Sequence, residues 1–388
     1  MRTLSILGST GSVGCATLEI LRRVRGQGDI RIALLSAHRQ AALLARQALE
    51  FRPQAVALGD ETGLPELRTA LKGTGIEIIA GEAALVNAAQ VPADITMVAV
   101  VGACGLEATL IAARAGRVIL FANKECLVCG GTLVTDTVRT HGATLLPIDS
   151  EHSALFQLLL RNGREGLDRV AITCSGGPLW ALSAEQMTKV AREQVLTHPV
   201  WSMGKKITVD SATMMNKGLE IIEASYLFDL PEAMIDVVIH PQTYVHALAM
   251  YDNGGVFAHL GVPDMSIPIS YGLCWPDGDP MPVPGLDLTC AMHWDFQPPD
   301  PIRFPALNLA RQALRDGGSA PIILNAANEV AVAAFLEEKI SYAHIVPLVD
   351  KVYEAISPHC VTTLQDVLEV DETARRVARE TLSDKANG

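Results

Sequence analysis

The 388-residue chain has little charge, few aromatic residues and no long apolar run. Charged residues make up 19% and aromatic residues 5%, while hydrophobic residues reach 49%, a composition typical of a folded globular protein. The net charge of −12 argues against broad binding to nucleic acid or to anionic membranes, because phosphate contacts need clustered Lys and Arg. An anionic small substrate stays compatible with this charge if basic residues gather locally. The longest apolar run, residues 95–106, is too short for a membrane-spanning helix.

The sequence also lacks the two C-x-x-C motifs that a typical zinc site needs. Its eight cysteines are scattered, and only Cys126 and Cys129 form a C-x-x-C, with no second pair to complete a zinc site. A redox role is open for this pair, but the apolar flanks favour two small buried residues. An apolar strand pattern starts within a few residues of Met1, so no signal or transit peptide is visible. These features predict a cytoplasmic protein with reduced thiols.

The pattern along the chain predicts an α/β fold with several domains. Short apolar runs alternate with helical patterns over residues 1–146, which indicates a doubly wound Rossmann-type domain. Residues 147–275 are turn-rich and predict an α+β catalytic domain. Residues 276–305 hold eight of the 21 prolines and predict an extended connector. Residues 306–388 predict a domain of four helices. The strands expected in the first domain are 3–8, 30–36, 55–58, 76–81, 95–101, 117–122 and 143–148.

Three glycines follow the first predicted strand. Gly8, Gly11 and Gly14 lie where a strand meets a helix, so backbone N–H groups could approach a pyrophosphate at the helix N-terminus. The spacing differs from the common G-x-G-x-x-G, and a tight structural turn is the alternative. No acid follows the second strand, where NAD-specific folds place one. Ser36, His38 and Arg39 stand there instead and favour the 2′-phosphate of NADP, unless Arg39 is only a surface charge.

The stretch PIDSEHSALFQ, residues 147–157, follows the last strand of the first domain. Asp149 and Glu151 can converge on one hard cation. Ser150 or Ser153 could instead cap the next helix, with an acid in its first turn. The local residues do not decide between these interpretations, and His152 has no assigned role.

A second group of polar residues lies in DSATMMNKGLEIIEA, residues 210–224. We expect a helix that starts at Asp210 or Ser211. Asn216 and Glu220 then share one face with Lys217 beside them, which suits a phosphorylated ligand and a cation. A surface helix with a Lys–Glu pair is the alternative.

Two loops could complete such a site. In CSGGP, Ser175 offers a hydroxyl, and the next two glycines allow close backbone approach to a phosphate, although a simple turn explains them equally. In HPVWSMGKK, Trp201 is flanked by Gly204, Lys205 and Lys206, which predicts a mobile lid near residues 198–207. A packed Trp is the alternative.

Taken together, GSTGSVG, FANKE, LPIDSEHSALFQ, CSGGP, HPVWSMGKKITVDSATMMNKGLEIIEA, VIHPQ and ILNAANEVA closely resemble one family. It is 1-deoxy-D-xylulose 5-phosphate reductoisomerase, of the methylerythritol phosphate route to isoprenoids. The resemblance runs from residue 4 to about residue 350 with the motifs in order. It implies an NADPH- and metal-dependent homodimer that rearranges and reduces 1-deoxy-D-xylulose 5-phosphate to 2-C-methyl-D-erythritol 4-phosphate.

The resemblance also implies roles for individual residues. The metal ligands, for Mg²⁺, Mn²⁺ or Co²⁺, would be Asp149, Glu151 and Glu220. These three would form the catalytic group together with Lys124 and His198. The substrate would be held by Lys124, Ser150, Glu151, Ser175, His198, Trp201, Ser211, Asn216, Lys217 and Glu220. The cofactor would contact Thr10, Gly11, Ser12, Val13, Ala37, His38, Arg39, Asn123, Glu125 and Gly204.

Some positions depart from the family pattern. The loop after the second strand reads SAHRQ, Cys126 replaces a usual Ser, and Thr243 and Tyr244 replace a Ser-Met pair. His246 sits in a matching position without an assigned role. Two other functions fit parts of the sequence: another two-domain NADP-linked dehydrogenase and a non-enzymatic dinucleotide sensor. The first needs a reactive Cys with a His partner, and the second has no use for three carboxylates and a phosphate cradle.

Overall fold

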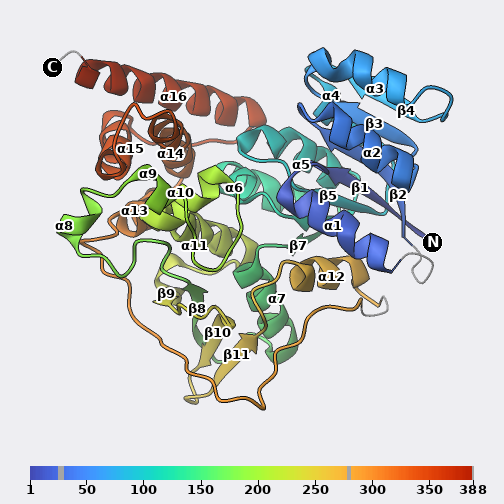
Figure 1. Ribbon diagram of the computed structural model, residues 1–388. Coiled ribbons are helices and arrows are strands. Elements are labelled where there is room, and N and C mark those ends of the chain that lie inside the picture. Colours follow the sequence, from blue (N-terminus) through green and yellow to red (C-terminus); the bar gives the residue numbers. More distant parts are fainter. Residues whose placement is uncertain (25–29, 278–280, 387–388) are drawn as a thin grey trace. The chain divides into compact units, whose positions relative to one another are not determined.

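The computed structural model describes residues 1–24, 30–277 and 281–386 (Figure 1). By its internal contacts the chain forms two compact units. The first comprises residues 1–126, 134–153 and 264–285, and the second comprises residues 127–133, 154–263 and 286–388.

The first unit is built on a seven-stranded sheet with the order β4-β3-β2-β1-β5-β6-β7. All neighbouring strands are parallel. The order of the strands reverses between β1 and β5, and at such switch points doubly wound folds bind ligands beyond the carboxyl ends of the strands. The strands are β1 (Arg2–Leu7), β2 (Ile30–Ala37), β3 (Ala55–Leu58), β4 (Glu77–Ala80), β5 (Ile95–Val98), β6 (Val118–Phe121) and β7 (Thr144–Pro147).

Helices connect these strands, as the alternating pattern predicted. They are α1 (Ser12–Arg23), α2 (Ala41–Phe51), α3 (Leu64–Ala70), α4 (Ala84–Gln90), α5 (Leu106–Arg114) and α6 (Lys124–Thr140), with the short 3₁₀ turns η1 (Glu61–Gly63) and η2 (Ala103–Gly105).

One helix of the first unit comes from far along the chain. α12 (Ser266–Cys274) packs beside α1 and against β6 and β7 (Figure 1). The Arg2 guanidinium donates to the carbonyls of Leu273 and Trp275, at 2.6 Å each. A Cβ at Gly272 would lie 2.8 Å from a Leu120 methyl, so a residue without a side chain lets α12 approach the sheet closely. This helix was not among the predicted elements.

The second unit contains a mixed four-stranded sheet with the order β11-β10-β8-β9. β8 pairs with β9 in parallel, and β10 pairs antiparallel with both β8 and β11. The strands are β8 (Leu167–Cys174), β9 (Ile235–Ile239), β10 (Val245–Tyr251) and β11 (Val256–Leu260).

Helices make up most of the rest of this unit. α14 is buried along nearly its whole length and packs against α10, α13, α15 and α16. The helices are α7 (Ser150–Asn162), which begins in the first unit, α8 (Ala184–Met187), α9 (Arg192–Val195), α10 (Lys205–Thr213), α11 (Met215–Phe228), α13 (Ala306–Asp316), α14 (Ala320–Leu336), α15 (Ile345–Ala355) and α16 (Leu364–Ala386), with η3 (Glu232–Met234) and η4 (Tyr342–His344).

The predicted fold class is confirmed, and one helix boundary is wrong. All seven strands of the first sheet and the four carboxyl-terminal helices form where expected. However, no helix starts at Asp210 or Ser211. Both residues lie within α10, which begins at Lys205 in the segment predicted as a lid, and the chain turns at Met214 (φ 60°) before α11 starts. None of the helices in the described ranges is long and apolar enough to span a bilayer.

Candidate functional site

The glycine-rich loop lies at the switch point of the first sheet. Gly8 has φ +93°, and a Cβ there would lie 2.5 Å from the Ala99 carbonyl oxygen, at the end of β5. A Cβ at Gly14 would lie 2.3 Å from the Gly8 oxygen. Glycine is therefore required at both positions. Gly11 and Ser12, at the start of the 12-residue helix α1, are exposed, so the helix N-terminus can receive a pyrophosphate.

Two side chains from neighbouring elements hold this loop. Ser36 of β2 accepts a hydrogen bond from the Gly8 N–H at 2.9 Å and is 3% exposed. Its predicted contact with a 2′-phosphate is wrong, because the hydroxyl is buried against the loop. Gln47 of α2 contacts both the hydroxyl and the carbonyl of Ser9, and it was missed in the sequence because a single Gln on a helix gives no signal.

The end of β2 presents the residues predicted to select the cofactor. Ala37 is 8% exposed, whereas His38 and Arg39 are exposed. Arg39 Nε lies 3.4 Å from Asp60 Oδ2, and the Arg39 side chain is 77% exposed. Hydrogen bonds from Thr62 are the main cause that lowers the pKa of Asp60, with a smaller contribution from Arg39.

Asn123 lies between β6 and α6 and is the N-cap residue of α6. Its Oδ1 accepts from the Cys126 N–H at 2.9 Å, and its Nδ2 donates to the Gly102 carbonyl at 2.9 Å. Asn123 therefore caps the helix and holds the loop after β5. Glu125 is buried in the first turn of α6. Cys126 and Cys129 are both buried, which confirms the prediction of two small buried residues.

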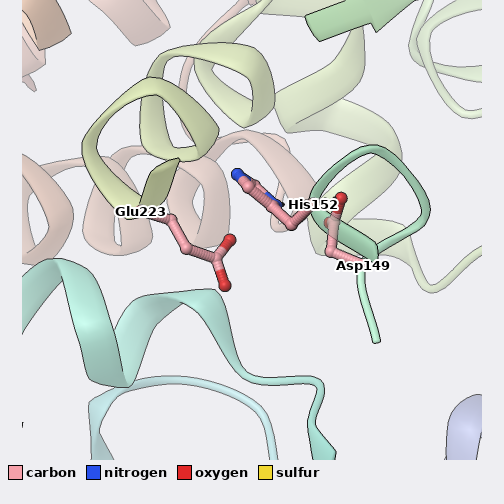
Figure 2. Close-up of side chains that lie close together, drawn as sticks. All are labelled: Asp149, His152 and Glu223. Atoms are coloured by element: carbon pink, nitrogen blue, oxygen red, sulfur yellow. Dashed lines mark ion pairs between the residues drawn. The ribbon is translucent and has the colours of Figure 1, made fainter. Parts of the chain in front are cut away.

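Asp149 lies between two basic side chains of the first unit. Lys124 Nζ is 2.8 Å from Asp149 Oδ2, and His152 Nδ1 is 3.2 Å from Asp149 Oδ1. His152 is fully buried and lies close to Asp149 at the start of α7 (Figure 2). Lys124 thus pairs with one oxygen of the carboxylate, and His152, unassigned from the sequence, lies beside the other oxygen of this predicted metal ligand.

Neither serine of this stretch caps the helix. α7 begins at Ser150, and the Ser153 N–H donates to the Asp149 carbonyl at 2.8 Å, so Asp149 occupies the N-cap position. The Ser150 hydroxyl donates to Glu151, which lies in the first turn. The two carboxylates Asp149 and Glu151 therefore lie on the helix N-terminus, which favours negative charge, rather than on a separate turn.

The first turns of α11 in the second unit carry the other predicted ligands. The Lys217 ammonium pairs with Glu220, which also accepts a hydrogen bond from the Asn216 amide. Lys217 is 3% and Glu220 1% exposed. The surface-helix alternative is wrong, because both charges are buried, and buried charges need the pairing and hydrogen bonds found here.

Ser175, His198 and Ser211 gather near the turn after β8. Ser175 Oγ lies 3.0 Å from His198 Nε2, and a Cβ at Gly177 would lie 2.4 Å from the Ser211 carbonyl oxygen. His198 Nδ1 accepts from the backbone N–H of Trp201 at 2.8 Å, so Nε2 carries the proton toward Ser175. Burial lowers the pKa of His198 to about 4. Trp201 is partly buried, and Gly204 is the exposed N-cap of α10.

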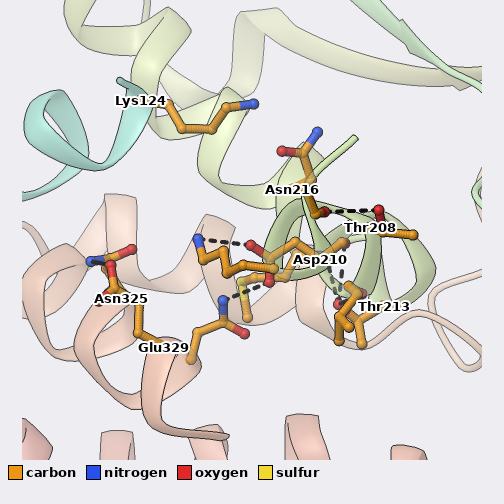
Figure 3. Close-up of polar contacts among 12 residues, drawn as sticks. Lys124, Thr208, Asp210, Thr213, Asn216, Asn325 and Glu329 are labelled. Atoms are coloured by element: carbon orange, nitrogen blue, oxygen red, sulfur yellow. Dashed lines mark hydrogen bonds and ion pairs between the residues drawn. The ribbon is translucent and has the colours of Figure 1, made fainter. Parts of the chain in front are cut away.

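The buried carboxylate of Asp210 links α10 to α14. Asp210, 1% exposed, accepts from Asn328 of α14 at 2.8 Å and pairs with Lys206 at 2.8 Å. Figure 3 shows Asp210 on α10 and, on α14, Asn325 and Glu329. The sequence did not reveal this support, since no local spacing links residues 118 positions apart.

His246 is also buried, on β10. Burial is the main cause that lowers its pKa to about 4, and His259 contributes. Their ring centroids are 6.2 Å apart. Thr243, one of the departures from the family pattern, has a left-handed φ of 55° in the turn before β10.

The doubly wound sheet with a glycine-rich loop at its switch point, together with buried Lys–carboxylate clusters, is typical of dinucleotide-dependent oxidoreductases. Three family models match the chain: 1-deoxy-D-xylulose 5-phosphate reductoisomerase at residues 4–131, its C-terminal domain at 145–228, and the DXP reductoisomerase C-terminal domain at 260–377. The chain belongs to the 1-deoxy-D-xylulose 5-phosphate reductoisomerase family.

Full-length relatives support this assignment. The chain is 50% identical over 380 residues to the 1-deoxy-D-xylulose 5-phosphate reductoisomerase of Rhodospirillum centenum, covering 98% of this chain and 94% of that protein. The solved enzyme of Zymomonas mobilis in complex with NADPH has a TM-score of 0.91 at 42% identity, covering 98% and 99% of the two chains. A reductoisomerase in complex with NADPH, fosmidomycin and magnesium has a TM-score of 0.92 at 39% identity, covering 100% of both chains.

Proposed function

We propose that this chain converts 1-deoxy-D-xylulose 5-phosphate to 2-C-methyl-D-erythritol 4-phosphate in isoprenoid precursor synthesis, with NADPH as reductant and a divalent cation as Lewis acid. The observation that carries the proposal is the buried pair of Lys217 and Glu220 on α11, to which the Asn216 amide donates a hydrogen bond. An ammonium and a carboxylate kept side by side away from water suit a phosphate and a metal ion better than they suit a purely structural helix.

The first unit would bind NADPH. The glycine loop fits a pyrophosphate because Gly11 and Ser12, at the start of α1, are exposed and leave the helix N-terminus accessible. The exposed His38 and Arg39, with Ala37 beside them, would bind the 2′-phosphate. The remaining cofactor contacts would come from Thr10, Gly11, Ser12, Val13, Asn123, Glu125 and Gly204.

Asp149, Glu151 and Glu220 would hold the divalent cation. Carboxylate oxygens are the donors that Mg²⁺ and Mn²⁺ prefer, and Glu220 is kept from water. When bound, the cation supplies Lewis acidity to neighbouring substrate oxygens.

The residues around these ligands would position and polarise the substrate. Lys124, 9% exposed, would place a positive charge beside the oxygen on which negative charge develops during the carbon rearrangement. Ser150 would contact the same end of the substrate. The phosphate at the other end would be held by Ser175, His198, Ser211, Asn216 and Lys217, which fixes the fragments while a carbon–carbon bond breaks and reforms.

Closure of the loop before α10 would complete the site. Trp201 would cover the substrate and exclude water from the reactive fragments. The backbone contact of Trp201 with His198 supports this arrangement, because closure of the loop and placement of the phosphate contact are then linked.

Two further properties follow from the resemblance. We expect a homodimer, which light scattering of the purified protein would test, and a cytoplasmic location, which fractionation of the source cells would test.

One assay tests the proposed function. NADPH oxidation should require both 1-deoxy-D-xylulose 5-phosphate and a divalent cation, and the product should be 2-C-methyl-D-erythritol 4-phosphate by mass spectrometry. NADPH oxidation without the rearranged product would contradict the proposal and favour an ordinary dehydrogenase. NADPH binding without any oxidation of NADPH would favour a dinucleotide sensor.

A second test addresses the metal ligands. Glu220→Gln should lower kcat by about 100-fold or more, because a neutral amide is a weaker ligand for a hard cation. Mn²⁺ affinity, measured by calorimetry, should fall with it. Glu232→Gln is the matched control, since it removes an equal charge that pairs with Arg311 of α13 and should leave Mn²⁺ binding intact. Near-normal turnover and Mn²⁺ affinity in Glu220→Gln would remove this residue from the metal site.

A further inference from the structure

We propose that Gln47 is a positioning residue for the cofactor: from α2 it fixes the Ser9 peptide and thereby aims the backbone of the glycine-rich loop at the NADPH pyrophosphate. The inference rests on the proposed function, in which Thr10–Val13 contact NADPH, and it adds a residue that does not itself touch the cofactor.

Gln47 holds Ser9 at two points. Its Oε1 accepts from the Ser9 hydroxyl at 2.8 Å, and its Nε2 donates to the Ser9 carbonyl at 2.9 Å. Ser9 is 0% and Gln47 5% exposed, so neither group can exchange these bonds for water without opening the loop. One amide side chain thus contacts two of the three polar groups of a single buried residue.

The other side of Ser9 is held by β2. The Ser9 N–H donates to the Ser36 carbonyl at 2.8 Å, and the Ser36 hydroxyl accepts from the Gly8 N–H. Ser9 is therefore bound at its N–H, hydroxyl and carbonyl. Only the contacts to its carbonyl control the next peptide plane, and Gln47 makes the shorter of them, at 2.9 Å against 3.5 Å from the Cys15 thiol.

The geometry of the peptide bond carries this constraint into the binding loop. In a trans peptide the carbonyl and the following N–H point in opposite directions. Because Gln47 holds the Ser9 carbonyl from α2, the Thr10 N–H points away from the Gln47 amide, and the next two residues, Gly11 and Ser12, are exposed. A loop that can rotate this peptide would present its N–H groups to the pyrophosphate only part of the time, which weakens binding in proportion.

The test is NADPH affinity, measured by fluorescence titration without substrate. Gln47→Met keeps the length of the side chain and removes both contacts, so we expect the Kd for NADPH to rise about tenfold. KM for 1-deoxy-D-xylulose 5-phosphate and kcat at saturating NADPH should stay near those of the parent. Leu44→Ala is the matched control: Leu44 lies on the same helix and is 0% exposed, so its loss should lower Tm and leave the Kd unchanged.

Gln47→Glu separates positioning from packing. When protonated, its carboxyl group can donate to the Ser9 carbonyl as the amide does, whereas the carboxylate cannot. Its NADPH affinity should therefore approach that of the parent at about pH 6 and fall at about pH 8.5, because burial raises the pKa of a carboxyl group into this range. At the lower pH it should bind NADPH more tightly than Gln47→Met.

Three outcomes would overturn the inference. Equal NADPH affinity in Gln47→Met and the parent would remove the positioning role. A protonated Gln47→Glu that binds no better than Gln47→Met would show that donation to the Ser9 carbonyl is unimportant. A parent protein that does not bind NADPH would overturn the proposed cofactor site as well, which distinguishes that failure from the other two.

Discussion

His198 shows how the protonation state of one residue is set by its surroundings. Its Nδ1 accepts backbone hydrogen bonds from Val200 and Trp201, and its Nε2 faces Ser175. Burial lowers its pKa from 6.5 to about 4. At neutral pH the ring is therefore an uncharged donor, and in our proposal Lys217 would provide the positive charge for a phosphate.

The pH dependence of stability follows from this shift. The folded pKa lies below the unfolded value, so the unfolded chain takes up the proton first, and stability falls as the pH drops from 6.5 toward 4. We expect urea unfolding midpoints to decrease over this window, and less steeply in His198→Gln. An equally steep decrease in that variant would assign the effect to other groups, of which the buried His246 is the first candidate.

Arg39 governs the choice between NADPH and NADH in our proposal. Arg39→Ala should raise KM for NADPH more than KM for NADH, because only NADPH carries the 2′-phosphate that a guanidinium binds. Arg31→Ala is the control, since Arg31 is exposed at the opposite end of the same strand. Steady-state kinetics with both cofactors measure the ratio, and equal effects on both would exclude Arg39 from 2′-phosphate recognition.

At the scale of elements, helices and strands were predicted best in the first domain, where apolar runs and helical patterns alternate regularly. Each strand of the first sheet is an apolar run between helices, and the run alone locates it. The start of α11 was misplaced because the residues that break the chain there, around Met214, have no glycine or proline among them. The left-handed turn at Met214 is imposed by tertiary packing, since Met214 is 2% exposed.

The contact between α11 and α13 offers a test of helix packing. A Cβ at Gly218 would lie 2.7 Å from the Ala310 Cβ, so Gly218→Ala should cost about 1–2 kcal/mol of unfolding free energy despite its better helix propensity. Adding Ala310→Gly removes the overlapping atom and should recover part of the loss. Denaturant unfolding measures both variants. A double variant that is less stable than Gly218→Ala alone would contradict the packing explanation.

At the scale of the whole molecule, the proposed ligand contacts are divided between the two units. The glycine loop, Ser36 and Gln47 belong to the first unit, as do Lys124, Asp149 and Glu151, whereas Glu220 and the residues proposed to hold the phosphate belong to the second. The sequence could predict each group from its own motif, but nothing local in it indicated which groups would share a compact unit.

We expect a chelator to separate NADPH binding from turnover, because the glycine-rich loop contains none of the three proposed metal ligands. EDTA should abolish turnover and leave NADPH binding intact, so that NADPH at 100 times its Kd still stabilises the fold by about 2.7 kcal/mol. Thermal unfolding with and without NADPH, each in EDTA, measures this. Loss of the NADPH-dependent rise in Tm upon chelation would show that the cofactor site depends on the cation.

The packing of α12 on the first unit has a consequence for biosynthesis. Arg2 is anchored by carbonyls 271 and 273 residues further along the chain. At ordinary translation rates, roughly 15–50 s pass between the synthesis of β1 and that of its anchor. Leu120 and Ile148, which α12 contacts at Gly272, lack this cover on the nascent chain until α12 is made. The amino-terminal part of the first unit therefore leaves the ribosome early, but the unit gains its last helix, α12, only late in synthesis. We expect a ribosome-associated chaperone to shield this part in the meantime.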